Sequence, residues 1–513
     1  STFPSEDMPG IDLVIQDISY LLKNKDKIKG ILITHGHEDH IGGLPYLLKG
    51  INAPVYGTKL TLTLAENKMR EHKLNDYSFN CVKAGSVISL GAFRVEFINV
   101  NHSISGACAL SISTPVGVVF HSGDFKIDLT PINGEVMDIT RISEIGKKGV
   151  TSLLCESTNV ERSGFAPSET IVGTTLERLF AENLKKRIII ATFASNVHRL
   201  QQILNIAQRY KRKVAFSGRS MINVAESASK IGELEIPNGI IVDIEKIKNY
   251  ADKDLVIVST GSQGEPMSVL SRMAYGDYNQ VKVTSNDAII ISASPIPGNE
   301  KNVYKVINNL YRIGAEVYYE SLEKIHVSGH AFQDELKILH SLIKPKFFIP
   351  IHGEYRHLKK HITLAKGMGM KESNMLIADI GDCVEITEKS MKKGENFTAG
   401  SRLVDGLSID EDGEIVRDRI QLGEDGIIVV LLTISRENGE VLQGPDIIAR
   451  GTTFTEENVT ELKSLVIKNI ITNNKRAFRD MAEVRSVIRK TARNYAYKRI
   501  KHSPMIIPII TEI

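Results

Sequence analysis

Short apolar runs, each followed by polar residues, recur along the first 160 positions of the chain. They predict strands over 31–33, 53–56, 82–100, 109–113, 117–121 and 153–155, with turns around Gly85 and Gly91 inside the region 82–100. Apolar residues at helical spacing predict helices over 12–22 and 60–72, and a third that begins after Gly43. The first third of the chain is therefore expected to mix helices and strands.

From about residue 187 the pattern becomes a regular alternation of strands and helices. Strands are predicted over 187–192, 213–217, 254–260 and 288–292, and a helix over 196–210. Such alternation favours a parallel sheet covered by helices, which places this part in the α/β class. The segment has no dinucleotide-binding glycine motif and no P-loop, so it gives no signal for a nucleotide cofactor.

The last quarter of the chain reads as a separate small module. A charged stretch over 389–402 is predicted to be a linker, followed by a strand over 425–435 and helices over 456–472 and 475–501. On the last helix an apolar stripe (Met481, Val484, Ile488, Tyr495) runs beside a row of arginines (Arg485, Arg489, Arg493). Residues 473–501 hold ten Lys or Arg against two acids. The sequence leaves open whether this face is merely solvated, contacts a phosphate backbone or contacts a partner subunit.

The composition fits an ordinary globular protein. The chain has 513 residues, 42% of them hydrophobic, and a net charge of +3, which does not by itself indicate nucleic-acid binding. Its four cysteines are scattered, as is typical of a reducing cytoplasm. No apolar run approaches the ~18 residues that cross a membrane, so no membrane partner is expected. The chain begins at Ser1 without an initiator Met, so we expect a processed or incomplete chain.

The densest chemistry lies where the predicted strand 31–33 runs into His35, His37, Asp39 and His40. Neutral imidazole and carboxylate are the usual ligands of zinc and related divalent ions. A lone histidine is more often structural than a ligand. Three histidines and an aspartate in one tight loop add nothing to a core and cost desolvation, so the motif predicts a metal site.

Further polar residues follow predicted strands in the same way: His102, Asp124, Glu156 and His352. Taken singly, each is better explained as a turn former or helix cap. Together with the loop at 35–40 they complete a shell for two ions. One ion is expected on His35, His37 and His102. The other is expected on Asp39, His40 and His352, with Asp124 bridging, a spacing of about 3.5–4 Å that suits in-line attack on phosphorus.

The order of these motifs resembles the β-CASP branch of the metallo-β-lactamase superfamily, most closely the ribonuclease J family. The resemblance rests on HGHEDH at 35–40, NHS at 101–103, SGD at 122–124, ESTN at 156–159, HVSGH at 326–330 and HGEYR at 352–356. It implies an αββα metallo-β-lactamase domain in two halves, 1–165 and 323–388, with a β-CASP α/β domain inserted over 166–322. The linker over 389–402 and a small α+β domain over 403–513 would follow.

The resemblance implies a cytoplasmic, metal-dependent ribonuclease with 5′–3′ exonuclease and endonuclease activity in rRNA processing and mRNA decay. Two divalent ions, Zn²⁺ or alternatively Mn²⁺, would activate the attacking water, and RNA with a 5′-monophosphate would be preferred. A homodimer or homotetramer is implied, with a paralogous subunit as an alternative.

The family's site residues carry over position by position. Its metal ligands fall on His35, His37, Asp39, His40, His102, Asp124 and His352. Its phosphate-contacting motif falls on His326, Val327, Ser328, Gly329 and His330, and its acidic motif on Glu156. We expect Glu156 to donate and His330 to accept the proton, with the Ser328 hydroxyl and Gly329 amide binding a backbone phosphate.

The chain departs from the family pattern at its beginning. The family has strands and a supporting aspartate before the segment in which this chain begins, Ser1 to Pro4, and their loss would loosen the binding of the ions.

Three other functions are alternatives to that of a ribonuclease. A hydrolase of small esters or thioesters is disfavoured by the insert and by HVSGH. A DNA-directed β-CASP nuclease stays open. A non-catalytic RNA-binding scaffold of an RNA-degradation complex is disfavoured because all seven ligands are present.

Overall fold

The computed structural model describes residues 4, 8–132, 135–265, 267–296, 298–406, 408–410, 413–435, 440–473 and 481–513. These residues form two units. The larger spans Gln16–Ser401, and the smaller combines the N-terminal residues up to Ile15 with Arg402–Ile513. The domain limits expected from the sequence, the linker over 389–402 among them, stay predictions.

The larger unit contains two sheets that pack face to face. A six-stranded sheet has the order β15-β9-β8-β7-β6-β5, and a parallel three-stranded sheet has the order β2-β3-β4. Val95 and Phe97 point into a core shared with Leu32 and Tyr56 of the small sheet. The strands are β2 (Ile31–Leu32), β3 (Val55–Gly57), β4 (Phe79–Cys81), β5 (Val87–Leu90), β6 (Phe93–Asn99), β7 (Cys108–Thr114), β8 (Gly117–His121), β9 (Ser152–Glu156) and β15 (Phe347–Ile351).

Helices cover the outer faces of this pair of sheets. The core under α5, α11 and α12 includes Phe120, Leu153 and Phe348 of the six-stranded sheet. On the other side α4 packs Leu60 and Ala65 into a core with Val55 of the small sheet. This is the predicted αββα order. The helices of this part are α1 (Ser19–Lys23), α2 (Glu38–Ile41), α3 (Leu44–Leu48), α4 (Lys59–Glu71), α5 (Ile139–Lys148), α11 (Gln333–Ile343) and α12 (Tyr355–Gly367).

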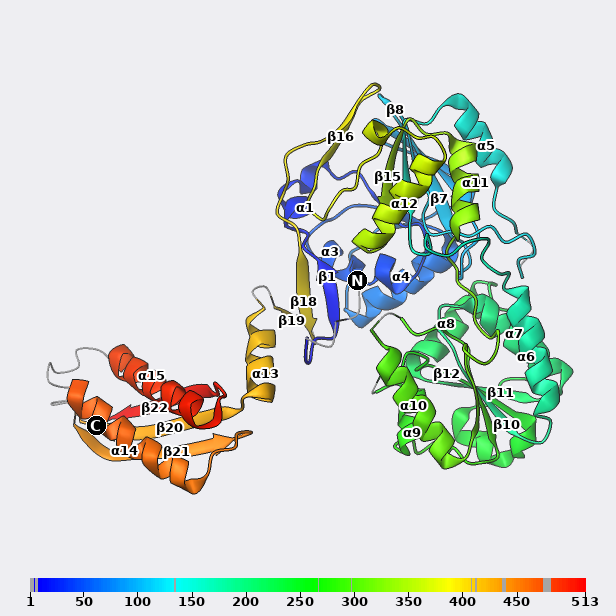
Figure 1. The fold of residues 1–513 in the computed structure, drawn as a ribbon. Helices are drawn as coiled ribbons and strands as arrows, with labels where there is room; N and C mark the ends of the chain where they lie inside the picture. The colour runs from blue at the N-terminus through cyan, green and yellow to red at the C-terminus, as the bar shows by residue number, and fades with distance from the viewer. Residues whose placement is uncertain are drawn as a thin grey trace. The chain divides into compact units, whose positions relative to one another are not determined.

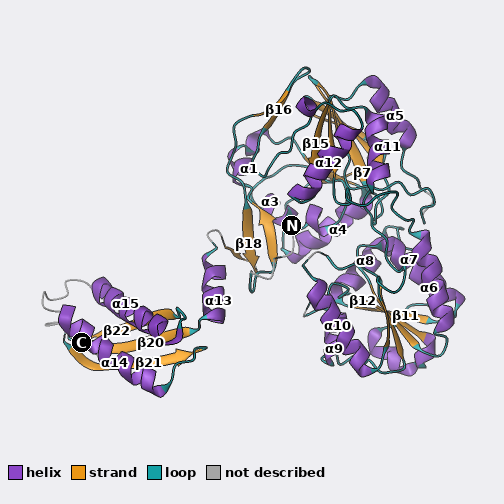
Figure 2. Cartoon of the chain, in the orientation of Figure 1, coloured by secondary structure: helices purple, strands orange, loops and turns teal. Residues whose placement is uncertain are grey.

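Between α5 and α11 the chain forms a five-stranded, fully parallel sheet in the order β11-β12-β10-β13-β14. Its strands are β10 (Arg187–Ala191), β11 (Lys213–Ser217), β12 (Leu255–Ser259), β13 (Asp287–Ile291) and β14 (Glu316–Tyr318). Ile188 and Ile190 pack under α6 (Thr170–Glu182), α7 (Val197–Arg209) and α8 (Arg219–Lys230). Ile189 and Ala191 pack under α9 (Val269–Tyr275) and α10 (Glu300–Ile313) (Figure 2). The predicted parallel sheet covered by helices is thereby confirmed.

One prediction about local structure, the helix over 12–22, is wrong because part of it pairs as a strand. Residues 12–22 do not form one helix, because β1 (Leu13–Gln16) lies in a sheet with β18 (Ser401–Asp405) and β19 (Ser408–Asp410). The amide of Asp12 donates to the carbonyl of Val404 at 2.9 Å, and only α1 is helical. The predicted linker contains β17 (Met391–Lys393), which pairs with β16 (Val384–Ile386). The backbone hydrogen bonds of both segments are formed with another strand, which is distant in sequence for β1 and adjacent for β17. Side-chain periodicity alone does not reveal such pairing.

The smaller unit carries two helices on one face of a three-stranded sheet. Its main elements are α13 (Glu414–Glu424), β20 (Ile427–Ile434), β21 (Val441–Arg450), α14 (Glu456–Asn473), α15 (Met481–Ile500) and β22 (Met505–Glu512). β20 is central, antiparallel to β21 and parallel to β22. Val484 and Ile488 of the predicted apolar stripe pack on Ile428 and Val430, whereas residues 475–480 of the predicted last helix lie outside the described residues. Among the helices described, α14 and α15 included, none combines the length and apolar character needed to cross a lipid bilayer.

Candidate metal centre

All seven predicted ligands meet where the segments after β2, β6, β8 and β15 come together. Their ligand atoms form two groups, in each of which the atoms lie within 4.8 Å of one another. One group is His35, His37 and His102, and the other is Asp39, His40, Asp124 and His352. These are the two sets expected from the sequence, drawn from four strand ends over more than 300 positions.

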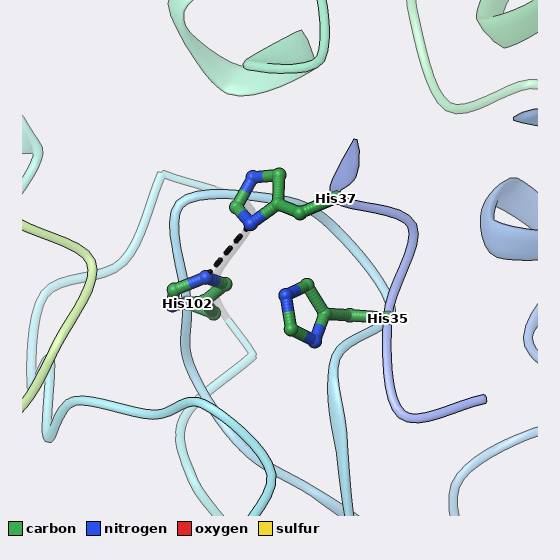
Figure 3. Close-up of side chains that lie close together, drawn as sticks. All are labelled: His35, His37 and His102. Carbon is green, nitrogen blue, oxygen red and sulfur yellow. Dashed lines mark hydrogen bonds between the residues drawn. The ribbon is translucent and has the colours of Figure 1, made fainter. Parts of the chain in front are cut away.

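The first group consists of three imidazoles turned toward one another (Figure 3). Nε2 of His102 lies 3.0 Å from Nδ1 of His37. His35 is fully buried, and its Nε2 has no hydrogen-bond partner among the described residues. Burial lowers the pKa of all three rings, that of His37 to about 4, and so favours the neutral form that binds metal ions. A buried nitrogen without a partner is costly unless it serves as a ligand.

The second group joins two imidazoles to two carboxylates. Nε2 of His352 lies 3.2 Å from Oδ2 of both Asp39 and Asp124, and Nε2 of His40 lies 3.2 Å from Oδ2 of Asp124. Burial opposes protonation, but hydrogen bonds to the two carboxylates raise the pKa of His40 to about 9 and that of His352 to about 11. A divalent ion here would take the place of these protons.

Asp124 lies between the two groups. It is only 3% exposed, and its Oδ2 also lies 3.6 Å from Nε2 of His35 and 4.0 Å from Nε2 of His102. One carboxylate oxygen is therefore within reach of ligands from both groups. Gly123 makes this placement possible: its φ is +58°, and a Cβ there would lie 2.6 Å from the carbonyl oxygen of Cys108.

The outward nitrogen of three ligand rings is held by a neighbouring oxygen. Nδ1 of His35 lies 3.1 Å from Oγ1 of Thr34, and Nδ1 of His352 lies 3.1 Å from Oγ1 of Thr158. Nδ1 of His102 donates to the carbonyl oxygen of Gly329 at 2.7 Å. Such partners fix the ring so that Nε2 faces the site. The motifs do not by themselves predict these roles for Thr34 and Thr158, although one adjoins a ligand and the other lies within the ESTN motif.

The ESTN loop also holds the backbone of His352. β15 runs parallel to β9 with Ile351 opposite Glu156, so His352 follows directly beside Ser157. His352 has a φ of 53°, which is strained for a non-glycine residue, and its carbonyl accepts from the Ser157 amide at 3.2 Å. Oγ of Ser157 lies 3.0 Å from Nδ1 of His361, a fully buried ring, so the loop is anchored in the core beneath α12.

Glu156 is fully buried and contacts His330 rather than a ligand group. Its Oε2 lies 2.8 Å from Nδ1 of His330, and its Oε1 accepts from the Phe125 amide at 2.8 Å. Both oxygens are therefore occupied. Burial lowers the pKa of His330, but the Glu156 carboxylate outweighs it, so the net shift is upward. The His330 ring stands 4.9 Å from that of His102, centroid to centroid.

The HVSGH motif divides into two parts. Ser328, Gly329 and His330 lie beside the ligand groups, with Asn159 Nδ2 donating to Ser328 Oγ at 2.6 Å. Val327 is only 5% exposed and belongs to a hydrophobic core, so its side chain faces away from the site. His326 is also largely buried, which lowers its pKa to about 4, with Arg199 adding to the shift. Of the side chains of the motif, that of His330 lies beside a ligand ring and that of Val327 is held in the core.

The donor set fits two divalent cations. Five imidazoles and two carboxylates supply the ligand atoms, and the unpartnered Nε2 of His35 points among them. The outward nitrogens of His35, His102 and His352 are already satisfied, as they are in metal sites. The arrangement can therefore bind two ions beside an ionisable His–Glu pair.

Four family models match successive parts of the chain. They are described as metallo-beta-lactamase superfamily over residues 4–136, ribonuclease J beta-CASP domain over 185–310, Zn-dependent metallo-hydrolase RNA specificity domain over 314–376, and ribonuclease J C-terminal domain over 414–513. The first three matches lie in the larger unit, apart from residues 4–15, and the fourth lies in the smaller unit.

Curated relatives match over nearly the whole chain. Ribonuclease J2 of Bacillus subtilis is 38% identical over 99% of this chain and 92% of its own length. Ribonuclease J of Synechocystis is 41% identical over 91% of this chain and 73% of its own. A solved structure of a protein of unknown function from Enterococcus faecalis V583 is 16% identical, with a TM-score of 0.49 over 68% of this chain and 79% of that chain. On the curated relatives and the four family models, the chain belongs to the ribonuclease J family and is a metal-dependent ribonuclease that hydrolyses phosphodiester bonds.

Proposed function

We propose that this ribonuclease removes nucleotides from the 5′ end of RNA, prefers a 5′-monophosphate and also cuts internally, in rRNA processing and mRNA decay. The observation that carries the proposal is the contact of the phosphate-binding motif with a metal ligand, from the Gly329 carbonyl to His102. A phosphate on Ser328 and Gly329 is thereby held next to the two ligand groups. An end group bound there would bring the adjoining phosphodiester toward the metals.

Ser328 is prepared to donate to such a phosphate. Its Oγ already accepts hydrogen bonds from Asn159 Nδ2 at 2.6 Å and from the His330 amide at 3.2 Å. Because both bonds use its lone pairs, its hydroxyl hydrogen is left for an acceptor from outside. A monophosphate concentrates nearly two negative charges on one compact group, whereas the first phosphate of a triphosphate carries only one and is followed by two more phosphates that need space.

We assign two divalent ions to the ligand groups, Zn²⁺ first and Mn²⁺ as the alternative, since imidazole and carboxylate suit both. When bound, such ions supply Lewis acidity at phosphorus and lower the pKa of water. His35, His37 and His102 would hold one ion. Asp39, His40 and His352 would hold the other, with Asp124 shared. The buried imidazoles exclude competing water from this side of the site.

We assign the proton exchange to His330, with Glu156 as its positioning partner. The sequence predicts that Glu156 donates the proton directly, but both its oxygens are engaged, with His330 and with the Phe125 amide. Its carboxylate fixes Nδ1 of His330 as the protonated nitrogen, which leaves Nε2 for the reacting oxygen. The arrangement resembles the orientation of a general acid–base histidine by a carboxylate.

We further propose a cytoplasmic homodimer or homotetramer, with a paralogous subunit as the alternative. The face of the sheet β21-β20-β22 opposite its helices exposes Leu442, Ile448, Ile507 and Ile509, and such apolar faces favour association. All four cysteines have free thiols, which suits a reducing compartment. Light scattering of wild type and of the Ile507→Lys, Ile509→Lys variant tests the assembly, and an unchanged mass would contradict this face as the contact.

The test of the activity compares the cleavage of three substrates of one sequence. They are RNA with a 5′-monophosphate, RNA with a 5′-triphosphate, and the matched DNA. Metal content is measured on the same sample. We expect processive 5′ cleavage of the monophosphate, slower cleavage of the triphosphate and little cleavage of the DNA. His37→Ala or Asp124→Ala should abolish cleavage, whereas His502→Ala, at an exposed histidine of the smaller unit, should not. Equal rates on both RNA ends would remove the end preference, and faster cleavage of DNA would overturn the substrate class.

A further inference from the structure

One exposed face of α15 carries a row of basic residues with an aromatic ring among them. Arg485, Arg489 and Arg493 are exposed, and Tyr497 and Lys501 continue the row at the same spacing of four residues. Tyr497 is 57% exposed, and Nζ of Lys501 lies 5.6 Å from its ring centroid. Residues four apart are neighbours on the surface of a helix, and Lys501, the first residue after α15, lies over the Tyr497 ring. These five side chains therefore form one continuous surface, here called the α15 row.

A neighbouring face of α15, about 100° around the helix, fixes the α15 row in place. Val484, Ile488, Ala492 and Ala496 are fully buried in the core that α15 shares with α14 and β20. In Figure 1, α15 is drawn in orange-red next to β22. The helix rises about 1.5 Å per residue, so the row extends over about 18 Å from Arg485 to Tyr497. Several charges are thus presented on a rigid element.

The arginines of the α15 row have no acidic partner among the residues that the structure describes. Within the described residues, none of Arg485, Arg489 and Arg493 forms an ion pair. The nearby acid Glu461 of α14 is already engaged by Arg499 and by the Tyr495 hydroxyl. Lys490 and Lys498 are exposed beside the row and add to its positive charge. The surface therefore offers free guanidinium donors to an anion from outside.

The composition of the α15 row decides between the candidate partners. A second copy bound symmetrically through this face would set like charges against each other. A purely solvated face gives no reason for an exposed tyrosine among the arginines. Single-stranded nucleic acid offers phosphates for guanidinium groups and unpaired bases that stack on an aromatic ring.

We propose that the α15 row is a second RNA-binding surface, separate from the metal centre. Arg485, Arg489 and Arg493 bind successive backbone phosphates, and an unpaired base stacks on Tyr497. The surface raises the affinity for long single-stranded RNA without taking part in the cleavage itself. This inference rests on the proposed function only in that RNA is the polymer bound.

The test compares the salt dependence of RNA binding by the full chain in EDTA, which prevents cleavage. The probe is a fluorescent 30-nucleotide unstructured RNA. Loss of three phosphate contacts should reduce the slope of log affinity against log salt by about 2 in R485Q/R489Q/R493Q. The control K246Q/K248Q/K253Q removes three exposed lysines of the larger unit and should keep the wild-type slope. Tyr497→Ala should weaken binding at least about fivefold, and Tyr497→Phe should not.

Cleavage assays separate this proposal from the proposed function. A dinucleotide substrate has no backbone left for a second surface, so all variants should cleave it at the wild-type rate. If wild type cleaves RNA but R485Q/R489Q/R493Q keeps its salt slope, the α15 row is not an RNA-binding surface. If wild type neither binds nor cleaves RNA, the proposed function itself fails. Polyglutamate bound as tightly as RNA, and lost in the same variant, would indicate an acidic protein and overturn the proposal.

Discussion

Nδ1 of His102 lies 2.7 Å from the carbonyl oxygen of Gly329, a residue 227 positions further along the chain. A carbonyl only accepts, so Nδ1 carries the hydrogen and Nε2 of His102 is left for a metal ion. The contact also requires glycine, because a Cβ at position 329 would lie 2.8 Å from Nδ1 of His102 and 2.7 Å from Oγ of Ser103. The motif expected to bind phosphate therefore also orients a metal ligand.

Gly329→Ala should weaken metal binding as well as catalysis. The new methyl group would push the loop away from His102 and break the hydrogen bond that orients it, at a cost of about 10–100-fold in affinity for the ion on His35, His37 and His102. Competition with a chromogenic chelator measures this. Gly367→Ala is the matched control, since a Cβ there meets nothing within 4 Å. Unchanged metal affinity in Gly329→Ala would contradict the orienting role.

Thr158→Val should weaken the other ion selectively. It removes the hydroxyl that contacts both Nδ1 and the carbonyl of His352, at 3.1 and 3.3 Å, while keeping the side-chain volume. We expect about a tenfold loss in the affinity of the second group. Thr34→Val removes the partner of His35 and should act on the first group instead. Titration with Mn²⁺ followed by paramagnetic resonance distinguishes the two steps, and identical effects of both variants would contradict separate sites.

The two ligand groups should differ in the pH dependence of metal binding. His40 and His352, with pKa values raised to about 9 and about 11, hold protons at neutral pH that an ion must displace, so affinity for the second group rises with pH. His37, with a pKa lowered to about 4, is already neutral, so the first group should vary little. Calorimetry in buffers of different ionisation enthalpy counts the protons released.

The same shifts give a sign for stability in the chelated protein. A pKa raised on folding adds stability that is complete below the unfolded value of about 6.5 and is lost as pH rises through the folded value. The contribution of His40 should therefore fall between about pH 7 and 9 in EDTA. His40→Asn should remove that part of the pH dependence of the free energy of unfolding, as measured by urea titration. A variant that keeps the wild-type dependence would show that other groups cause it.

Glu156→Gln should reduce turnover while leaving both ions bound. An amide keeps the shape of the carboxyl group but not the charge that holds the His330 ring and raises its pKa. We expect kcat to fall about 100-fold, and the limb of the pH–rate profile that reports His330 to move to lower pH. Metal analysis of the purified variant is the control. A wild-type profile with the two ions present would exclude Glu156 as the positioning partner.

Much of the site could be predicted from the sequence because its ligands follow strands. A strand ends where its apolar run ends, and polar residues placed there are easy to recognise, as with His35 after Ile33 or His352 after Ile351. The alternation of strands and helices likewise predicted the parallel sheet of the insert. The element types follow from local periodicity, which the chain carries in every segment.

The tertiary structure alone decided the features that depend on distant pairing. β1 is a strand because it pairs with β18, almost 400 positions away, against its own helical periodicity. The hydrogen bonds that the Gly329 carbonyl and the Thr158 hydroxyl form with ligand rings depend on which loops meet in the fold. The same holds for the contacts that engage both oxygens of Glu156. The composition of the loops does not determine them. The sequence by itself determined which residues can bind metal ions. The fold determined which nitrogen of each ring faces them, because a hydrogen bond fixes a ring only once its partner is in place.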